Sequence, residues 1–239
     1  MRQILVTGGG SGIGRDVAQD FAAKGDAVTI AGRRMDALEE TAKGMDMRCL
    51  QADVTDEASV KMLFDRRYDV VVANAGAGHV MPVAQMPSQI WHDTLAVNLT
   101  GVFYTFRAAL QEMGPGGRLI AMASIASLKG GANLAAYAAA KHGVLGLVRS
   151  LAIEVAKQGI TCNAVCPGFV DTDMAAGAVK NVMKRMEVDQ STAEKMLVAN
   201  NPMRRMITAV EVTAAVRFLA SPEASMINGH DLVVSGGEI

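Results

Sequence analysis

Tyr137 and Lys141 lie four residues apart in an alanine-rich segment, and Ser124 precedes the tyrosine by thirteen residues. Residues spaced by four share one face of an α-helix. An ammonium group beside a phenol favours the phenolate, so we expect Lys141 to lower the pKa of Tyr137 from its usual value of about 10. A tyrosine tuned in this way can exchange a proton with a carbonyl or alcohol oxygen.

The same spacing also occurs in ordinary amphipathic helices whose lysine is solvated, so the chemistry needs support from a second motif. A glycine-rich run, residues 8–14, follows a short apolar segment and leads into a sequence of helical character. Glycines let a turn approach a pyrophosphate closely, and the amino end of the next helix offers free N–H groups and a positive dipole. We therefore expect a dinucleotide pyrophosphate at Gly8, Ser11, Gly12, Ile13 and Gly14.

The second apolar segment ends in Gly32, Arg33 and Arg34. Dinucleotide-binding folds that prefer NAD usually carry an acidic residue at this point, which binds the 2′-hydroxyl of the adenosine ribose. A guanidinium binds a 2′-phosphate instead. The sequence thus predicts that NADP(H) is preferred over NAD(H), with Arg33 on the phosphate and Arg34 against adenine. A solvated basic turn is the alternative.

Asp53 and Val54 follow the third strand candidate, where we expect the adenine to lie. The Asp53 carboxylate is placed to accept a hydrogen bond from the adenine amino group. The alternative role for Asp53 is to cap the next helix, which Thr55 could do equally well.

Short β-branched segments alternate with longer helical segments along the whole chain, and several of the strand candidates are apolar throughout. This is typical of parallel strands that are covered on both faces. Repeated β-α-β units predict an α/β fold, a Rossmann-type doubly wound parallel sheet of about seven strands with helices on both faces, in one domain over residues 1–239. The expected strands are 4–7, 27–31, 47–51, 70–73, 118–123, 161–165 and 231–234, and the expected helices are near 14–24, 35–43, 57–64, 88–113 and 137–157.

Residues 175–201 form a long excursion between a strand that ends at Pro167-Gly168 and a helix that begins near Ala209. In a doubly wound fold, an excursion from the carboxyl end of a strand lies over the ligand crevice. We therefore expect residues 175–201 to form a helical substrate lid. The alternative is a solvated pair of surface helices without contact to ligand.

The composition excludes several classes of protein. The net charge of −1 and the 4% aromatic content argue against a nucleic-acid surface. The longest apolar stretch, 134–156, is interrupted by charged residues, which argues against a membrane span. Three cysteines without metal-ligand or disulfide spacing predict no metal site and a cytoplasmic, reducing location.

Taken together, these motifs resemble the short-chain dehydrogenase/reductase family in its compact single-domain branch, over nearly the whole chain. The matching residues are Thr7-Gly8-x3-Gly12-x-Gly14, Asp53, Asn74-Ala75-Gly76, Asn98, Ser124, Tyr137-x3-Lys141 and Pro167-Gly168. The resemblance implies that Tyr137 is the general acid in reduction and that Ser124 polarises the substrate carbonyl. It also implies that Lys141 binds the nicotinamide ribose and that Asn98 holds a water linking Lys141 to solvent.

The resemblance further implies two loops that hold the cofactor. Asn74, Ala75 and Gly76 would line the cleft, and the nicotinamide would be held by Pro167, Gly168, Val170 and Thr172. Tyr137 and Lys141 would also contact the cofactor.

Within the family, residues 167–174 and the excursion after them look like those of β-ketoacyl and polyketide ketoreductases and of 3-hydroxyacid dehydrogenases. We therefore expect an NADP(H)-dependent reductase of a small carbonyl compound, such as a 3-oxoacyl thioester carried by CoA or a carrier protein. The alternatives are a secondary alcohol or sugar-type dehydrogenase with the same Ser-Tyr-Lys set, and a non-catalytic NADP(H) sensor. The helix led by Tyr137 is apolar on several faces, which suggests a homodimer or homotetramer.

Overall fold

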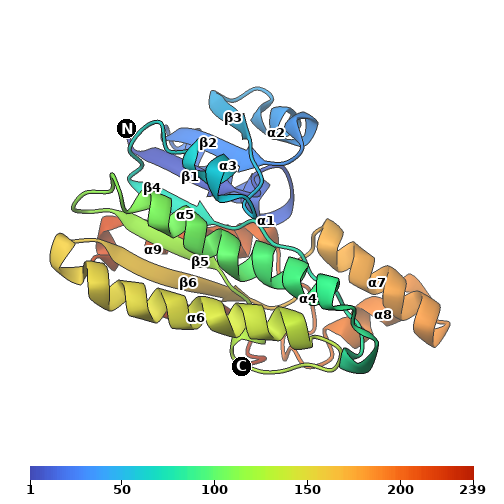
Figure 1. Cartoon of the computed structure of the whole chain (residues 1–239). Helices are drawn as coiled ribbons and strands as arrows, with labels where there is room; N and C mark the ends of the chain where they lie inside the picture. Colours follow the sequence, from blue (N-terminus) through green and yellow to red (C-terminus); the bar gives the residue numbers. More distant parts are fainter.

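The structure is a computed structural model that describes residues 1–239. A seven-stranded parallel sheet in the order β3-β2-β1-β4-β5-β6-β7 forms its centre, with helices on both faces (Figure 1), which confirms the expected fold class. The strands are β1 (Gln3–Thr7), β2 (Ala27–Gly32), β3 (Met47–Gln51), β4 (Val70–Ala73), β5 (Arg118–Met122), β6 (Thr161–Pro167) and β7 (Asp231–Val234). The helices are α1 (Gly12–Ala23), α2 (Met35–Ala42), α3 (Glu57–Lys61), α4 (Ser88–Leu95), α5 (Gly101–Ala109), α6 (Ala135–Val155), α7 (Asp173–Met186), α8 (Gln190–Leu197) and α9 (Ala209–Leu219).

The order of the strands reverses between β1 and β4. The chain builds β2 and β3 on one side of β1, and it then crosses back to pair β4 with the other side of β1. The loops that leave β1 and β4 therefore diverge to opposite faces of the sheet. Ligands of open α/β sheets bind at such a reversal, outside the carboxyl ends of the strands.

The core is divided into two layers by the sheet. Leu119 and Ile120 are neighbours on β5, and they point to opposite faces because side chains alternate along a strand. Leu119 packs in the layer under α5 and α6, with Phe106 and Val148. Ile120 packs in the layer under α1 and α9, with Phe21. Both faces are covered, which is why the central strand β4 is apolar at every position and its neighbours are mostly apolar.

The helical region after β4 differs from the sequence expectation. Instead of one helix over 88–113, α4 and α5 are joined by a π-helical turn, η2 (Ala96–Thr100). Turns of π-helix are rare and occur frequently at functional sites. Asn98, one of the predicted site residues, lies in the middle of this turn.

The excursion after β6 contains two helices, α7 and α8, which pack on each other and project from the body of the molecule (Figure 1). A bridge between Val170 and Ile207 closes the base of the excursion. No helix of the structure has the length and apolar character needed to cross a membrane.

Asn163 ties β6 to the segment before β7 and gives a test of this packing. Its buried amide donates to the Ile227 carbonyl at 2.8 Å and accepts from the His230 N–H at 2.9 Å. Asn163→Ala should lower the free energy of unfolding by roughly 2–4 kcal/mol, because two main-chain groups lose their partner. The measurement is denaturant unfolding. The control Asn181→Ala, on the exposed face of α7, should change it by less than about 0.5 kcal/mol, and an equal effect of both would contradict the prediction.

Candidate active site

The glycine-rich turn between β1 and α1 leaves no room for side chains. Gly8 and Gly12 have positive φ angles of 68° and 51°. A Cβ atom on Gly14 would lie 2.3 Å from the carbonyl oxygen of Gly8, and one on Gly8 would lie 2.9 Å from the Cα atom of Ala75. These positions require glycine, so the turn presents bare backbone at the carboxyl end of β1.

Asn74 joins this turn to the loop after β4. Its side-chain amide donates to the carbonyls of Thr7 at 3.0 Å and Gly8 at 3.3 Å. In return, the Thr7 hydroxyl oxygen accepts from the main-chain N–H groups of Asn74 at 3.1 Å and Ala75 at 3.2 Å. The two loops that diverge at the strand reversal are thus held at a fixed separation.

The amino end of α1 is suited to an anion. Ser11 precedes the helix without a side-chain capping hydrogen bond, and the first turn contains no acidic residue. The first N–H groups of a helix have no partner within it, and they carry the positive end of the helix dipole. Together with the glycine turn, these residues fit the pyrophosphate of a dinucleotide.

The loop after β6 reaches this turn from the other side. The N–H of Gly168 donates to the Val234 carbonyl at 3.0 Å, and Val170 pairs with Ile207. The hydroxyl of Thr172 donates to the Val170 carbonyl at 3.2 Å. A Cβ atom on Gly12 would lie 3.2 Å from the Thr172 methyl group, so the loop from β6 closes over the glycine turn.

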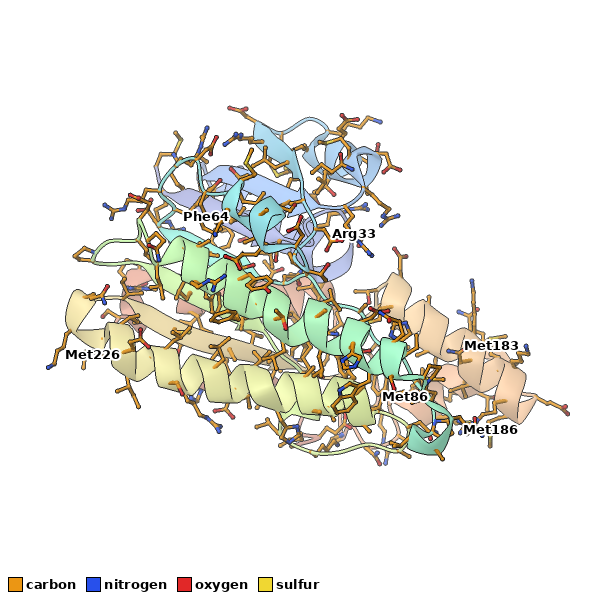
Figure 2. All side chains as sticks on the ribbon, in the orientation of Figure 1. Arg33, Phe64, Met86, Met183, Met186 and Met226 are labelled. Carbon is orange, nitrogen blue, oxygen red and sulfur yellow. The ribbon has the colours of Figure 1, made fainter.

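At the other end of the cleft, Arg33 and Arg34 are both exposed after β2, and Figure 2 shows Arg33 at the edge of the molecule. Asp53 accepts from the N–H and the hydroxyl of Thr55 at 2.9 and 2.8 Å. Partial burial acts to raise the pKa of Asp53, but the Thr55 hydrogen bonds and the charge of Arg33 hold this pKa below its usual value. The helix cap considered for Asp53 or Thr55 is made by Asp56, which accepts from the Ala58 N–H.

Ser124 is fixed directly after β5. Its hydroxyl oxygen accepts from the Ala126 N–H at 3.1 Å, and its own N–H donates to the Ser127 hydroxyl at 3.2 Å. This capping box begins the short helix η3 (Ile125–Ser127). The serine hydroxyl is consequently held at the carboxyl edge of the sheet, where Tyr137 meets it.

Burial raises the pKa of Tyr137, and a hydrogen bond with Ser124 opposes this effect. The expected net lowering of the Tyr137 pKa is wrong, because this pKa lies above its usual value. The Lys141 ammonium lies 5.6 Å from the centre of the tyrosine ring and donates to the Met122 carbonyl at 2.7 Å. Removal of the phenol from water therefore outweighs the Ser124 hydrogen bond, and the raised pKa favours the protonated phenol.

Lys141 itself is only 3% exposed. Its recorded hydrogen-bond partner is the main-chain carbonyl of Met122, at the end of β5. Burial without a paired carboxylate lowers its pKa to about 8. A Cβ atom on Gly76 would lie 3.7 Å from the ammonium nitrogen, so the loop after β4 passes directly over the lysine.

Asn98 holds that loop in place. Its side-chain amide donates to the carbonyls of Ala77 at 2.7 Å and Thr94 at 2.9 Å, and its oxygen accepts from the Ala77 N–H at 3.3 Å. Both amide hydrogens are thus used, so the side chain acts as a clamp on the loop over Lys141. The water-binding role expected for Asn98 stays a prediction.

Three contributors to the site were missed by sequence reasoning. Met122 and Ala77 act through main-chain groups, which leave no signal in the side-chain pattern. Thr7 belonged to the glycine motif, but no role was assigned to it. A hydroxyl directly before such a turn indicates a side chain that can accept hydrogen bonds from a neighbouring loop. No group of three or more histidine, cysteine or acidic side chains is arranged to hold a metal ion.

Comparison with known proteins agrees with this geometry. Residues 8–238 match the family model described as enoyl-(acyl carrier protein) reductase. A putative ketoacyl reductase of Streptomyces coelicolor is 34% identical over 98% of this chain and 95% of its own length. The 3-oxoacyl-[acyl-carrier-protein] reductase of Escherichia coli is 35% identical, with the same coverage of both chains.

A solved structure of actinorhodin polyketide ketoreductase with NADPH superposes with a TM-score of 0.92, at 33% identity, over 99% of this chain and 97% of that one. This chain belongs to the short-chain dehydrogenase/reductase family. The dehydrogenase/reductase is accordingly an oxidoreductase, and the ketoreductase type expected from its motifs is confirmed by these relatives.

The buried lysine gives this dehydrogenase/reductase a specific dependence of stability on pH. The pKa of Lys141 is about 8 in the folded chain, against about 10.4 for an unfolded lysine. Between these values the unfolded chain binds a proton that the folded chain has released, so rising pH stabilises the fold through this group. The stability of the natural protein relative to Lys141→Met should rise by roughly 3 kcal/mol across this interval.

The measurement is denaturant unfolding of both proteins, without added nucleotide, at about pH 7.5 and about pH 10.5. Cys162 and Cys166, whose pKa is raised to about 12 by burial, act in the opposite direction. Both thiols are present in both proteins. The Cys162 contribution cancels in the difference, and the Cys166 contribution cancels apart from its coupling to Lys141, whose charge lowers the pKa of that thiol. A difference that does not change with pH would contradict the burial of a titrating Lys141.

Proposed function

We propose that this protein reduces a ketone to a secondary alcohol with NADPH, and that its substrates are 3-oxoacyl thioesters or similar carbonyl compounds. The observation that carries this proposal is the convergence of Ser124, Tyr137 and Lys141 on one point at the carboxyl edge of the sheet. A regulatory protein that only sensed the dinucleotide would have no need of this proton-transfer set.

In the proposed reaction, Ser124 donates a hydrogen bond to the carbonyl oxygen and so polarises the C=O bond. NADPH, when bound, supplies the hydride that adds to the carbonyl carbon. Tyr137 then gives its proton to the oxygen, which becomes the hydroxyl of the product. The raised pKa of Tyr137 suits this direction, because the residue enters the reaction in its protonated form.

Lys141 and Asn98 would support the same proton transfer without contacting the carbonyl. The Lys141 ammonium would donate to the nicotinamide ribose while Met122 fixes its direction. The charge also stabilises the tyrosinate that remains after proton transfer. Asn98 keeps the loop over the lysine closed, and a water bound near it would return a proton to the site.

The same proposal assigns the remaining site residues to the cofactor. The glycine turn and the amino end of α1 would hold the pyrophosphate, the loop after β6 would hold the nicotinamide, and Asp53 and Val54 would hold the adenine. Arg33 and Arg34 are exposed and form no ion pair, and they favour the 2′-phosphate of NADP(H) over the 2′-hydroxyl of NAD(H). The solved relative with NADPH supports this preference.

The projecting helices α7 and α8 are proposed as the substrate lid. Met183 and Met186 lie on α7, and Met86 lies on the loop before α4 (Figure 2). Met174, Met186 and Met196 are exposed on the lid, and flexible thioether side chains suit an apolar acyl chain. Lys184 and Arg185 are charged at the end of α7, where a phosphopantetheine-linked carrier or CoA would approach.

A homodimer or homotetramer is supported by apolar groups exposed on α4, α5 and α6. They are Trp91, Phe103 and Ile153, the last of which is 81% exposed. The free cysteines favour the reducing cytoplasm.

The deciding experiment compares NADPH oxidation with acetoacetyl-CoA, crotonyl-CoA and a cyclic ketone. The family model's description makes crotonyl-CoA, an enoyl thioester, a necessary comparison. We expect acetoacetyl-CoA to be reduced fastest. Turnover of crotonyl-CoA alone would overturn the ketone proposal, and turnover of the cyclic ketone alone would favour the secondary alcohol dehydrogenase.

Tyr137→Phe should lower kcat of the ketone reduction by about 10²- to 10⁴-fold, because the proton donor is removed. The dissociation constant of NADPH, measured by fluorescence titration, should change by less than about twofold, since the hydroxyl contributes little to cofactor binding. Full activity in this variant would exclude the proposed mechanism.

Arg33→Asp should lower the ratio of kcat/KM for NADPH over NADH by about 10- to 100-fold, since a charge-assisted pair is replaced by repulsion. The control is Arg66→Asp, another exposed arginine whose nearest carboxylate is 3.5 Å away. If both variants keep the natural ratio, Arg33 does not read the 2′-phosphate.

A further inference from the structure

After β7 the chain makes a turn at Gly236 and Gly237. Gly236 and Gly237 have positive φ angles of 63° and 89°, which only glycine adopts without strain. A Cβ atom on Gly236 would lie 2.3 Å from the Asn201 side-chain oxygen, and one on Gly237 would lie 3.3 Å from Pro202. The tail therefore lies directly against the segment that follows α8.

This turn buries an acidic side chain. Glu238 is 7% exposed at its side chain and accepts from the ammonium of Lys129 at 2.8 Å. Its second carboxylate oxygen lies 3.7 Å from the position that a Cβ atom would take on Gly168. Ile125 and Ile207 approach the same position at 3.7 and 3.3 Å. The carboxylate thus lies where the serine loop, the loop after β6 and the tail meet.

The lysine of this pair is linked to Ser124 by a short, fully hydrogen-bonded path. The N–H groups of Leu128 and Lys129 both donate to the Ile125 carbonyl, at 3.0 and 3.1 Å. Ile125 in turn belongs to the η3 turn that Ser124 caps. The backbone from Ser124 to Lys129 is thus held by consecutive hydrogen bonds, which couple the position of the lysine to that of the serine.

We propose that the Lys129–Glu238 ion pair is a positioning device for Ser124, through which the tail of the chain fixes the serine hydroxyl against the substrate carbonyl. The inference rests on the proposed reduction. The two side chains of the pair differ in solvent exposure. Lys129 is 40% exposed and can reach water, whereas the Glu238 carboxylate is 7% exposed. Loss of the lysine leaves a buried charge without its partner, which is more disruptive than loss of the acid.

The experiment measures kcat and KM for acetoacetyl-CoA and the dissociation constant of NADPH in Lys129→Met, Glu238→Gln and the charge-reversed pair Lys129→Glu/Glu238→Lys. Lys129→Met should lower kcat by about 10- to 100-fold, the range for a small misplacement of a reacting group. Glu238→Gln should have a smaller effect, since its amide oxygen still accepts from Lys129. NADPH affinity should stay within about twofold, and the reversed pair should recover most of the lost kcat.

Arg149→Met is the matched control. It removes another ion pair, between Arg149 on α6 and Asp231 on β7 at 3.3 Å, which involves neither the η3 turn nor the tail. This variant should keep the natural kcat. The positioning role is overturned if Lys129→Met keeps the natural kcat, if its loss of kcat is matched by weaker NADPH binding, or if charge reversal restores none of the lost kcat. Whatever the outcome for Lys129, the proposed reduction is tested separately: it holds if the natural protein is active and Tyr137→Phe is inactive.

Discussion

The burial of one ammonium group organises the site. Lys141 enters the protein on α6 with no carboxylate to pair with, and an unpaired buried charge is tolerated only where main-chain dipoles replace water. The carbonyl of Met122 at the end of β5 supplies that replacement at 2.7 Å. The lysine therefore depends on the registry of α6 against β5, which the apolar layer under α5 and α6 maintains.

The cover over the lysine depends on the same constraint. The loop after β4 passes over the lysine, and a Cβ atom on Gly76 would lie 2.9 Å from the side-chain oxygen of Asn98, which holds this loop by three hydrogen bonds. A regular helix over 88–113 would place the side chains of α4 and α5 differently relative to each other. The π-helical turn shifts this register by one residue at the point where Asn98 must face the loop.

The cleft itself is held open by a different set of bonds. Asn74 and Thr7 connect the loops after β1 and β4 by hydrogen bonds. Without these bonds the two loops would move apart, because they lead to opposite faces of the sheet. The loop after β6 is anchored independently, to β7 by Gly168 and to Ile207 by Val170. The loops after β1, β4 and β6 are therefore each fixed by hydrogen bonds, and the Val170–Ile207 bridge closes the base of the projecting pair α7 and α8.

The sequence by itself determined the fold class, the position of each strand to within a few residues, and the residue types at the glycine turn and at Ser124, Tyr137 and Lys141. These are local properties, because strand pattern, glycine requirement and helical spacing are set by neighbours along the chain. Tertiary structure decided the direction of the Tyr137 pKa, the partner of Lys141 and the burial of Glu238. Each of these depends on how completely water is excluded and on which main-chain groups from distant segments lie nearby. The spacing of side chains along the sequence determines neither.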